Sequence, residues 1–124
     1  MRIIKKIEVE GEEVLGLFDT GATYTYVREE LTKNVLKRIL RMPFKVAIGG
    51  KSIEVDQFCL IGGKIDGLDF DTIAIPVDEI GKVDEKEIDV LIGALTMEQW
   101  EIIPNPKDGT LDLSGLRRRE FTEF

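Results

Sequence analysis

The sequence predicts a mostly β domain with one main helix and one short C-terminal helix. Short runs rich in β-branched and aromatic residues make up most of the chain, and turns that contain glycine separate many of them. Only residues 28 to 41 keep apolar residues at helical spacing over a long stretch. So few helices exclude a parallel α/β sheet, whose two faces need helical cover.

Four hairpins account for most of the predicted strands. In each of them, two β-rich runs flank a turn. The paired runs are residues 2–9 with 12–18, 44–48 with 53–55, 58–65 with 68–76, and 101–104 with 110–113. Two further runs are predicted as strands, the β-rich residues 24–27 and the apolar triplet at 90–92, which we expect to be buried.

The main helix is predicted over residues 28 to 41. Leu31, Val35 and Ile39 recur every fourth residue, which would place them on one helical face, and Pro43 ends the pattern. We expect this face to pack in the core.

The C-terminal part is predicted to contain the shorter helix and a tail. Residues 94 to 100 can make one to two helical turns after Gly93. Residues 116 to 124 are charged, and we expect them to be loosely held. The sequence therefore predicts one domain over residues 1 to 115, followed by a charged tail over residues 116 to 124.

Composition excludes several classes of function. The chain of 124 residues has no histidine and one cysteine, Cys59, which removes Ser/His and Cys/His nucleophiles and any thiolate metal cluster within one chain. Its net charge of −7 repels phosphate backbones, so nucleic acid is not an expected partner. We expect no metal and no organic cofactor, and any acid–base chemistry falls to carboxylates, lysine or tyrosine.

Hydrophobicity predicts an intracellular protein. Charged residues interrupt the N-terminus every two or three positions, so residues 1 to 8 have no signal-peptide core. An apolar run of about 20 residues, the length that spans a bilayer, does not occur. We therefore expect a cytoplasmic location and no membrane partner.

One motif carries most of the chemical information, a turn at the end of an apolar run over residues 14 to 18. The motif is Asp19-Thr20-Gly21-Ala22-Thr23. Amide hydrolysis by carboxylates needs one group that takes a proton from water and another that gives a proton to the carbonyl oxygen, about 3 Å apart. Asp19 is a candidate for this role, although Asp before Gly also often bonds to its own backbone in a turn.

The order of these parts resembles the retropepsin-like family of aspartic proteases. The shared order is a strand hairpin, Asp-Thr-Gly-Ala, a helix, a Gly-Gly hairpin, and an apolar triplet ending in Gly before a short helix, across roughly residues 5 to 114. Two anchors carry the resemblance, residues 17 to 23 and the segment Val90-Leu91-Ile92-Gly93-Ala94-Leu95.

The resemblance implies a fold, a site and an assembly. The fold is an acid protease barrel that is active as a two-fold homodimer, because the chain has one Asp-Thr-Gly and the second carboxylate must come from another copy. Asp19, Thr20 and Gly21 would be the catalytic residues. The substrate, a peptide or unfolded protein, would lie against Ala22 and Thr23 below a flap whose tip is Ile48-Gly49-Gly50-Lys51. Chain ends commonly form the dimer sheet, so Met1 to Ile4 and Thr110 to Ser114 are candidates for the interface.

The sequence leaves two other functions open. A catalytically inactive module with the same fold could hold an extended peptide or support dimerisation, and an accidental Asp-Thr-Gly could belong to a structural β domain. Gly49-Gly50 could be an ordinary hairpin turn. The acidic set Asp66, Asp69 and Asp71 lacks the ligand spacing of a calcium loop and favours a solvated strand edge.

Overall fold

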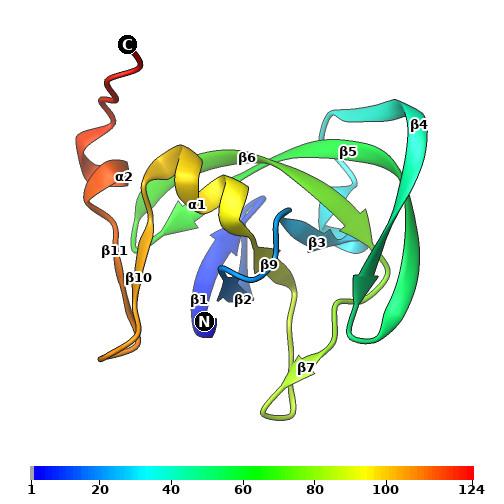
Figure 1. Ribbon diagram of the computed structural model, residues 1–124, viewed down its shortest axis with the longest axis horizontal. Coiled ribbons are helices and arrows are strands. Elements are labelled where there is room, and N and C mark those ends of the chain that lie inside the picture. The colour runs from blue at the N-terminus through cyan, green and yellow to red at the C-terminus, as the bar shows by residue number, and fades with distance from the viewer. Residues whose placement is uncertain (1) are drawn as a thin grey trace.

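A seven-stranded sheet forms most of the molecule, and three tight hairpins connect its longer strands (Figure 1). The computed structural model describes residues 2–124. The strand order is β1-β2-β9-β3-β6-β5-β4, and β1 also pairs with β5. The strands are β1 (Arg2–Val9), β2 (Glu12–Asp19), β3 (Tyr26–Arg28), β4 (Lys37–Ile48), β5 (Lys51–Ile65), β6 (Leu68–Val77) and β9 (Val90–Ile92).

The remaining elements are short. Two small hairpins pair outside the main sheet, and two α-helices and one 3-10 turn complete the chain. They are β7 (Lys82–Val83) with β8 (Lys86–Glu87), β10 (Ile103–Asn105) with β11 (Thr110–Asp112), α1 (Ala94–Trp100), α2 (Ser114–Arg118) and η1 (Glu29–Thr32). Within residues 2–124, none of the helices has the length and apolar character needed to cross a membrane.

The pairing confirms the four predicted hairpins and the mostly β architecture. β1 pairs with β2, β4 with β5, β5 with β6, and β10 with β11, all antiparallel. Two pairs are parallel, β2 with β9 and β3 with β6, so the buried triplet of β9 lies between β2 and β3. The helix predicted over residues 94 to 100 is confirmed as α1.

The predicted main helix over residues 28 to 41 is wrong. Only η1 is helical there, and β4 begins at Lys37, which pairs with Cys59 on β5. Helical propensity is a weak preference, and a ladder of hydrogen bonds to an existing strand outweighs it. The fourfold spacing does not mark a core face either, because Ile39 is 76% exposed.

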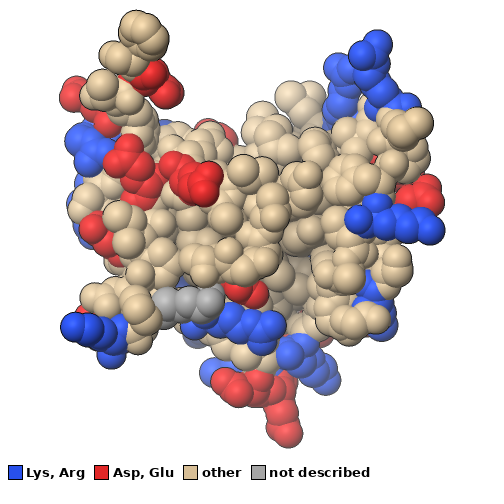
Figure 2. All heavy atoms as spheres, viewed as in Figure 1, with Lys and Arg blue, Asp and Glu red and all other residues tan. Residues whose placement is uncertain are grey.

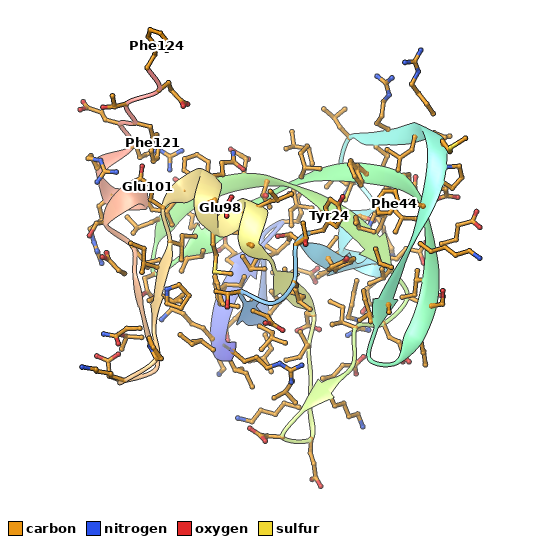
Figure 3. The ribbon with its side chains drawn as sticks, viewed as in Figure 1. Tyr24, Phe44, Glu98, Glu101, Phe121 and Phe124 are labelled. Atoms are coloured by element: carbon orange, nitrogen blue, oxygen red, sulfur yellow. The ribbon has the colours of Figure 1, made fainter. Side chains whose placement is uncertain are left out.

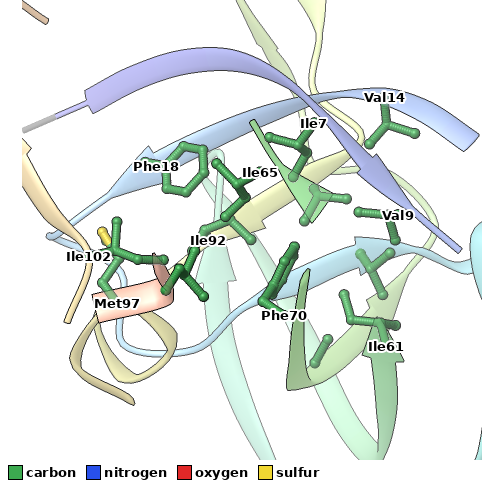
Figure 4. Packing of buried hydrophobic residues seen from close by; sticks show 14 of the residues in the cluster. Ile7, Val9, Val14, Phe18, Ile61, Ile65, Phe70, Ile92, Met97 and Ile102 are labelled. Carbon is green, nitrogen blue, oxygen red and sulfur yellow. The ribbon is translucent and has the colours of Figure 1, made fainter. Parts of the chain in front are cut away.

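The core lies between the N-terminal hairpin, β9, and the far ends of β5 and β6 (Figure 4). Phe18, Ile65, Phe70 and Ile92 are at most 1% exposed and come from four different strands. A second buried cluster fills the space below the β4–β5 hairpin. Burial also raises the pKa of the Cys59 thiol to about 11, which keeps it protonated and unreactive at neutral pH.

The C-terminal segment is held more firmly than the sequence predicts. Leu116 is 1% exposed within α2, and Arg118 forms an ion pair with Glu101 at 2.7 Å. The guanidinium of Arg119 lies 4.8 Å from the ring centroid of Trp100, and Phe121 meets the same ring edge-on. These contacts fasten residues 116 to 121 to the end of α1.

We predict that Ile92→Ala lowers the free energy of unfolding by about 2 to 5 kcal/mol, because the lost side chain leaves a cavity between β9 and its neighbours. Urea unfolding followed by circular dichroism measures this. Ile73→Ala is the matched control, since Ile73 is 54% exposed and its truncation should cost less than about 0.5 kcal/mol. Equal losses in the two variants would contradict the position of the core.

Candidate active site

The carboxylate of Asp19 is fixed by the turn that follows β2. Its Oδ1 accepts a hydrogen bond from the Gly21 N–H at 2.8 Å, and its backbone oxygen accepts one from the Ala22 N–H at 3.1 Å. A methyl group at position 21 would lie 3.1 Å from Oδ1, tighter than an ordinary contact. Glycine at this position therefore allows the backbone N–H to face the carboxylate without crowding it.

Sequence reasoning missed the partner of the other carboxylate oxygen. Nε of Arg2 lies 3.4 Å from Oδ2 of Asp19. The two residues face each other across the β1–β2 ladder, so the register of the hairpin brings them together. Counting seven residues back from Val9 and seven forward from Glu12 gives the facing pair Arg2 and Asp19, but not the ion pair between their side chains.

Asp19 opens onto a cleft of about 400 Å³ that lies between the turn after β2 and the β4–β5 hairpin. Several predicted site residues meet here. The turn contributes Asp19, Gly21, Ala22 and Thr23, and the hairpin contributes Ile48 and Gly49. Sequence reasoning did not single out Val46, Ala47 or Leu91, which also line this cleft.

Three predicted site residues lie elsewhere. Thr20 lines a separate cleft on the other side of the turn, beside Ile102 and Ile103. Gly50 is at the outer end of the hairpin turn. Lys51 points to the loop after β6, where its Nζ lies 2.6 Å from Oε1 of Glu79.

The tip of the β4–β5 hairpin needs both of its glycines. Ile48 pairs with Lys51, so the loop has two residues, Gly49 with φ 56° and Gly50 with φ 80°. Two consecutive positive φ values are typical of a type I′ turn, which follows the twist of the strands and favours glycine. A Cβ at Gly49 would be 3.6 Å from the backbone oxygen of Ile80, so this tip lies against the loop after β6.

Aromatic side chains connect the Asp19 turn with the base of the hairpin (Figure 3). The ring of Tyr24 lies 5.5 Å from that of Phe44 and 6.2 Å from that of Phe58, and Phe44 meets Phe58 edge-on. Such pairs add to the free energy gained from burial. The cluster forms one wall below the cleft and sets the distance between turn and hairpin.

The second anchor packs directly on the first. The N–H groups of Ala94 and Leu95 donate hydrogen bonds to the backbone oxygens of Ala22 at 2.7 Å and Thr23 at 3.1 Å. A Cβ at Gly93 would be 2.1 Å from the backbone oxygen of Tyr24, a distance that no side chain tolerates. Glycine is therefore required where β9 ends and α1 begins.

Behind this contact lies a chain of buried hydroxyl groups. Thr25 bonds to Thr96, and Thr96 to Thr72, each with 2.6 Å between the hydroxyl oxygens. The N–H of Gly93 donates to the Thr25 hydroxyl, and the Thr72 hydroxyl donates to the backbone oxygen of Ile73. One direction satisfies every group, in which Thr25 donates to Thr96 and Thr96 donates to Thr72. All three side chains are at most 4% exposed, so none can turn to water instead.

A second polar cluster joins β2, β3 and β9 at the far end of the sheet. Asp89 accepts a hydrogen bond from the Leu15 N–H at 2.8 Å and another from Nη1 of Arg28 at 3.0 Å. Burial lowers the pKa of Arg28, but the hydrogen bond to Asp89 and the charges of Glu30 and Glu87 outweigh it and raise that pKa. The cluster lies away from the Asp19 cleft and connects the residue before β9 with β2 and β3.

Three groups in or near the cleft have shifted pKa values. Burial, and then the neighbouring Tyr24, raise the pKa of Tyr26, which therefore stays protonated in the cleft. The hydrogen bond between Lys51 and Glu79 raises the pKa of the first and lowers that of the second, so both remain charged at neutral pH. Because both side chains are well exposed, this ion pair contributes little to stability.

The acidic set near the β5–β6 turn has lysine partners. Asp66 lies 3.1 Å from Nζ of Lys5, and Asp69 lies 3.4 Å from Nζ of Lys64. Across residues 2–124, no group of three or more acidic, histidine or cysteine side chains has an arrangement that could hold a metal ion.

Comparison with solved structures identifies the fold. The solution structure of simian foamy virus (mac) protease matches with a TM-score of 0.50 and 14% identity over 85% of this chain and 100% of the viral chain. The crystal structure of the retroviral protease-like domain of Ddi1 from Leishmania major matches with a TM-score of 0.59 and 16% identity over 91% of this chain and 88% of that one. No family model matches the sequence, and no curated protein matches it either. Identities this low show a shared fold and nothing more specific.

We predict that Thr96→Val lowers the free energy of unfolding by about 1 to 3 kcal/mol, because valine fills the same space but removes one hydrogen bond from each of two buried hydroxyl groups, the acceptor of Thr25 and the donor to Thr72. Urea unfolding of both proteins at one concentration measures the difference. Thr122→Val is the matched control, since Thr122 is exposed in the C-terminal segment. An unchanged midpoint for Thr96→Val would contradict the hydroxyl chain.

Proposed function

The chain has a retropepsin-like fold, and on that premise we propose that it is an aspartic endopeptidase that acts as a two-fold homodimer. One observation carries the proposal. A carboxylate held by the N–H of Gly21 opens onto a cleft covered by a Gly-Gly hairpin. β5 also pairs with β1, the first strand in the sheet order, and this pairing supports the closed barrel expected of such a protease.

The proposed chemistry uses Asp19 from each of two subunits. Two carboxylates about 3 Å apart cannot both ionise, so the pair shares one proton. The ionised group takes a proton from a water molecule, whose oxygen attacks the peptide carbonyl carbon, while the protonated group gives its proton to the carbonyl oxygen. The resulting diol collapses when a carboxyl proton passes to the amide nitrogen, one diol hydroxyl returns its proton to the other carboxylate, and the C–N bond breaks. The two carboxyl groups then share one proton again.

The surface beside Asp19 supports the proposed dimer. Thr20 follows Asp19 and lines a cleft of about 450 Å³ with residues of α1 and β10. Next to it, Leu95 is 51% and Ile103 is 57% exposed, unusual for large apolar side chains. A second subunit on this face would cover them and bring its own Asp19 close. Of the interface candidates, Met1 lies outside the described residues, and Leu113 is 1% exposed within its own subunit.

The proposed substrate is an extended polypeptide. Tyr24, Val46, Ile48 and Leu91 give the cleft apolar walls, so side chains of an unfolded segment could be buried there. The backbone of the β4–β5 hairpin lies along the same cleft and offers hydrogen-bonding groups to an added strand. Lys51 and Glu79 hold the hairpin tip near the loop after β6, and this ion pair would open when substrate enters.

One observation favours the second candidate, a peptide-binding module without catalysis. In a single chain the Asp19 carboxylate is paired with Arg2, which neutralises the charge that the reaction needs. If Arg2 keeps this position in the dimer, the groove would hold a peptide without cleaving it.

We predict that Asp19→Asn lowers the rate of cleavage of an unstructured protein at least about 100-fold, because an amide cannot exchange the proton in acid–base catalysis. Cleavage of a casein-type substrate is followed from acidic to neutral pH at matched dimer concentration. Asp66→Asn is the control, since it removes the same charge from an exposed turn. Activity retained in Asp19→Asn would contradict the mechanism, and peptide binding without cleavage by the wild type would favour the second candidate.

We also predict that Ile103→Glu shifts the protein to monomers and abolishes cleavage, because the interface would bury an unpaired charge beside Thr20. Sedimentation velocity measures the oligomeric state, and circular dichroism checks the fold. Ile73→Glu is the matched control, with a similarly exposed isoleucine on β6. A dimer that survives Ile103→Glu would place the interface elsewhere.

A further inference from the structure

The charges of this protein are distributed unevenly along the chain. Residues 31 to 53 contain six of the 17 Lys and Arg residues and none of the 24 Asp and Glu residues. The rest of the chain therefore carries 11 minus 24, or −13, against +6 in this segment. Figure 2 shows cationic side chains projecting from the corner of the molecule where β4 lies in Figure 1.

Large apolar side chains are exposed in the same segment. Leu36, Ile39 and Met42 are 76%, 76% and 80% exposed. All three are therefore open to solvent over most of their surface. Lys37, Arg38 and Arg41 alternate with them along the chain, and all three cations are exposed.

Two more exposed apolar side chains lie on the neighbouring strands beside Leu36. The Leu60 N–H donates to the backbone oxygen of Leu36 at 3.0 Å, and Leu60 pairs with Ile73 on β6. Leu60 is 40% and Ile73 is 54% exposed. We call the set of Leu36, Ile39, Met42, Leu60 and Ile73 with the cations Lys37, Arg38 and Arg41 the outer patch.

The composition of the outer patch restricts its partner. Two copies of the patch would repel each other, because each has three cations and no carboxylate among its members. Strand addition along β4 is blocked in the middle, since Pro43 has no N–H and the register shifts between Ile39 and Phe44. The partner must therefore be anionic, accept apolar side chains and need no backbone pairing.

We propose that the outer patch binds the interfacial region of an anionic lipid bilayer. A bilayer surface accommodates projecting apolar side chains without a complementary pocket, and its anionic headgroups attract the cations beside them. The acidic remainder of the protein would face away, and its repulsion is screened beyond about 8 Å at physiological ionic strength. The expectation of no membrane partner considered spanning segments, and a patch that lies on a bilayer needs none.

Binding in this way would leave the Asp19 cleft open. Phe44, Val46 and Ile48 of β4 pack toward the cleft and its aromatic wall, whereas Ile39 and Met42 of the same strand are exposed. The proposal does not depend on catalysis, so it can be tested with the Asp19→Asn protein as well as with the wild type.

The experiment is flotation with vesicles of equal parts phosphatidylcholine and phosphatidylserine, compared with pure phosphatidylcholine. We expect wild-type protein to bind the anionic vesicles at least about tenfold better, and to be released by salt. The triple variant Leu36→Ser, Ile39→Ser, Met42→Ser and the double variant Arg38→Gln, Arg41→Gln should each lose at least about tenfold. Circular dichroism confirms that each variant is folded.

Two matched controls keep the test specific. Phe124→Ser removes an exposed apolar side chain outside the patch, and Lys82→Gln with Lys86→Gln removes two cations from the β7–β8 hairpin. Both should bind as the wild type does. The proposal is overturned if wild-type protein ignores anionic vesicles, if the triple variant still binds them, or if the patch instead binds a soluble peptide of alternating Glu and Leu.

Discussion

The cleft depends on one close backbone contact, between Gly93 and the residues that follow the Asp-Thr-Gly turn. Ala94 and Leu95 donate hydrogen bonds to this segment. They can do so because Gly93 has no Cβ, which would clash with the backbone oxygen of Tyr24. These bonds hold the segment after Asp19 against the start of α1, and Asp19 lines the cleft. The same contact sets the start of α1, and so places exposed Leu95 beside the turn. Site geometry and the proposed dimer face thus share one structural cause.

The two halves of β4 contribute to two different surfaces of the molecule. Near its tip, Val46 and Ile48 are partly buried and line the cleft, whereas the alternating Lys45 is exposed and does not line it. The irregularity before Phe44 breaks this alternation and lets residues 37 to 42 be exposed almost throughout. A bulge therefore separates the part of β4 that would cover a substrate from the part that presents cations and apolar side chains to the outside.

The elements that the sequence predicted correctly are those whose conformation depends on residues close together in the chain. The Gly49-Gly50 hairpin, the buried β9 strand and α1 all follow from residues near in sequence, and the structure has each of them. Residues 28 to 41 could not be predicted in this way, because pairing with distant β5 decides their conformation. The Arg2 contact of Asp19 depends likewise on strand register, which leaves no signal in a motif.

If the proposed function holds, Arg2 and the single Asp19 carboxylate make one chain an incomplete site. An aspartic dyad needs two carboxylates that share a proton, and one chain supplies a single Asp-Thr-Gly carboxylate. In the isolated chain Arg2 has only Asp19 as its carboxylate within 4 Å among residues 2–124. In the proposed dimer, Asp19 of the second subunit would lie beside Asp19 of the first. The proton that the two carboxylates share would then take the place of the Arg2 guanidinium as the partner of Asp19. Arg2 is 64% exposed and sits at the start of β1, so it can swing away at little cost. On this account association switches Asp19 from an ion pair to a catalytic pair, which links activity to dimerisation.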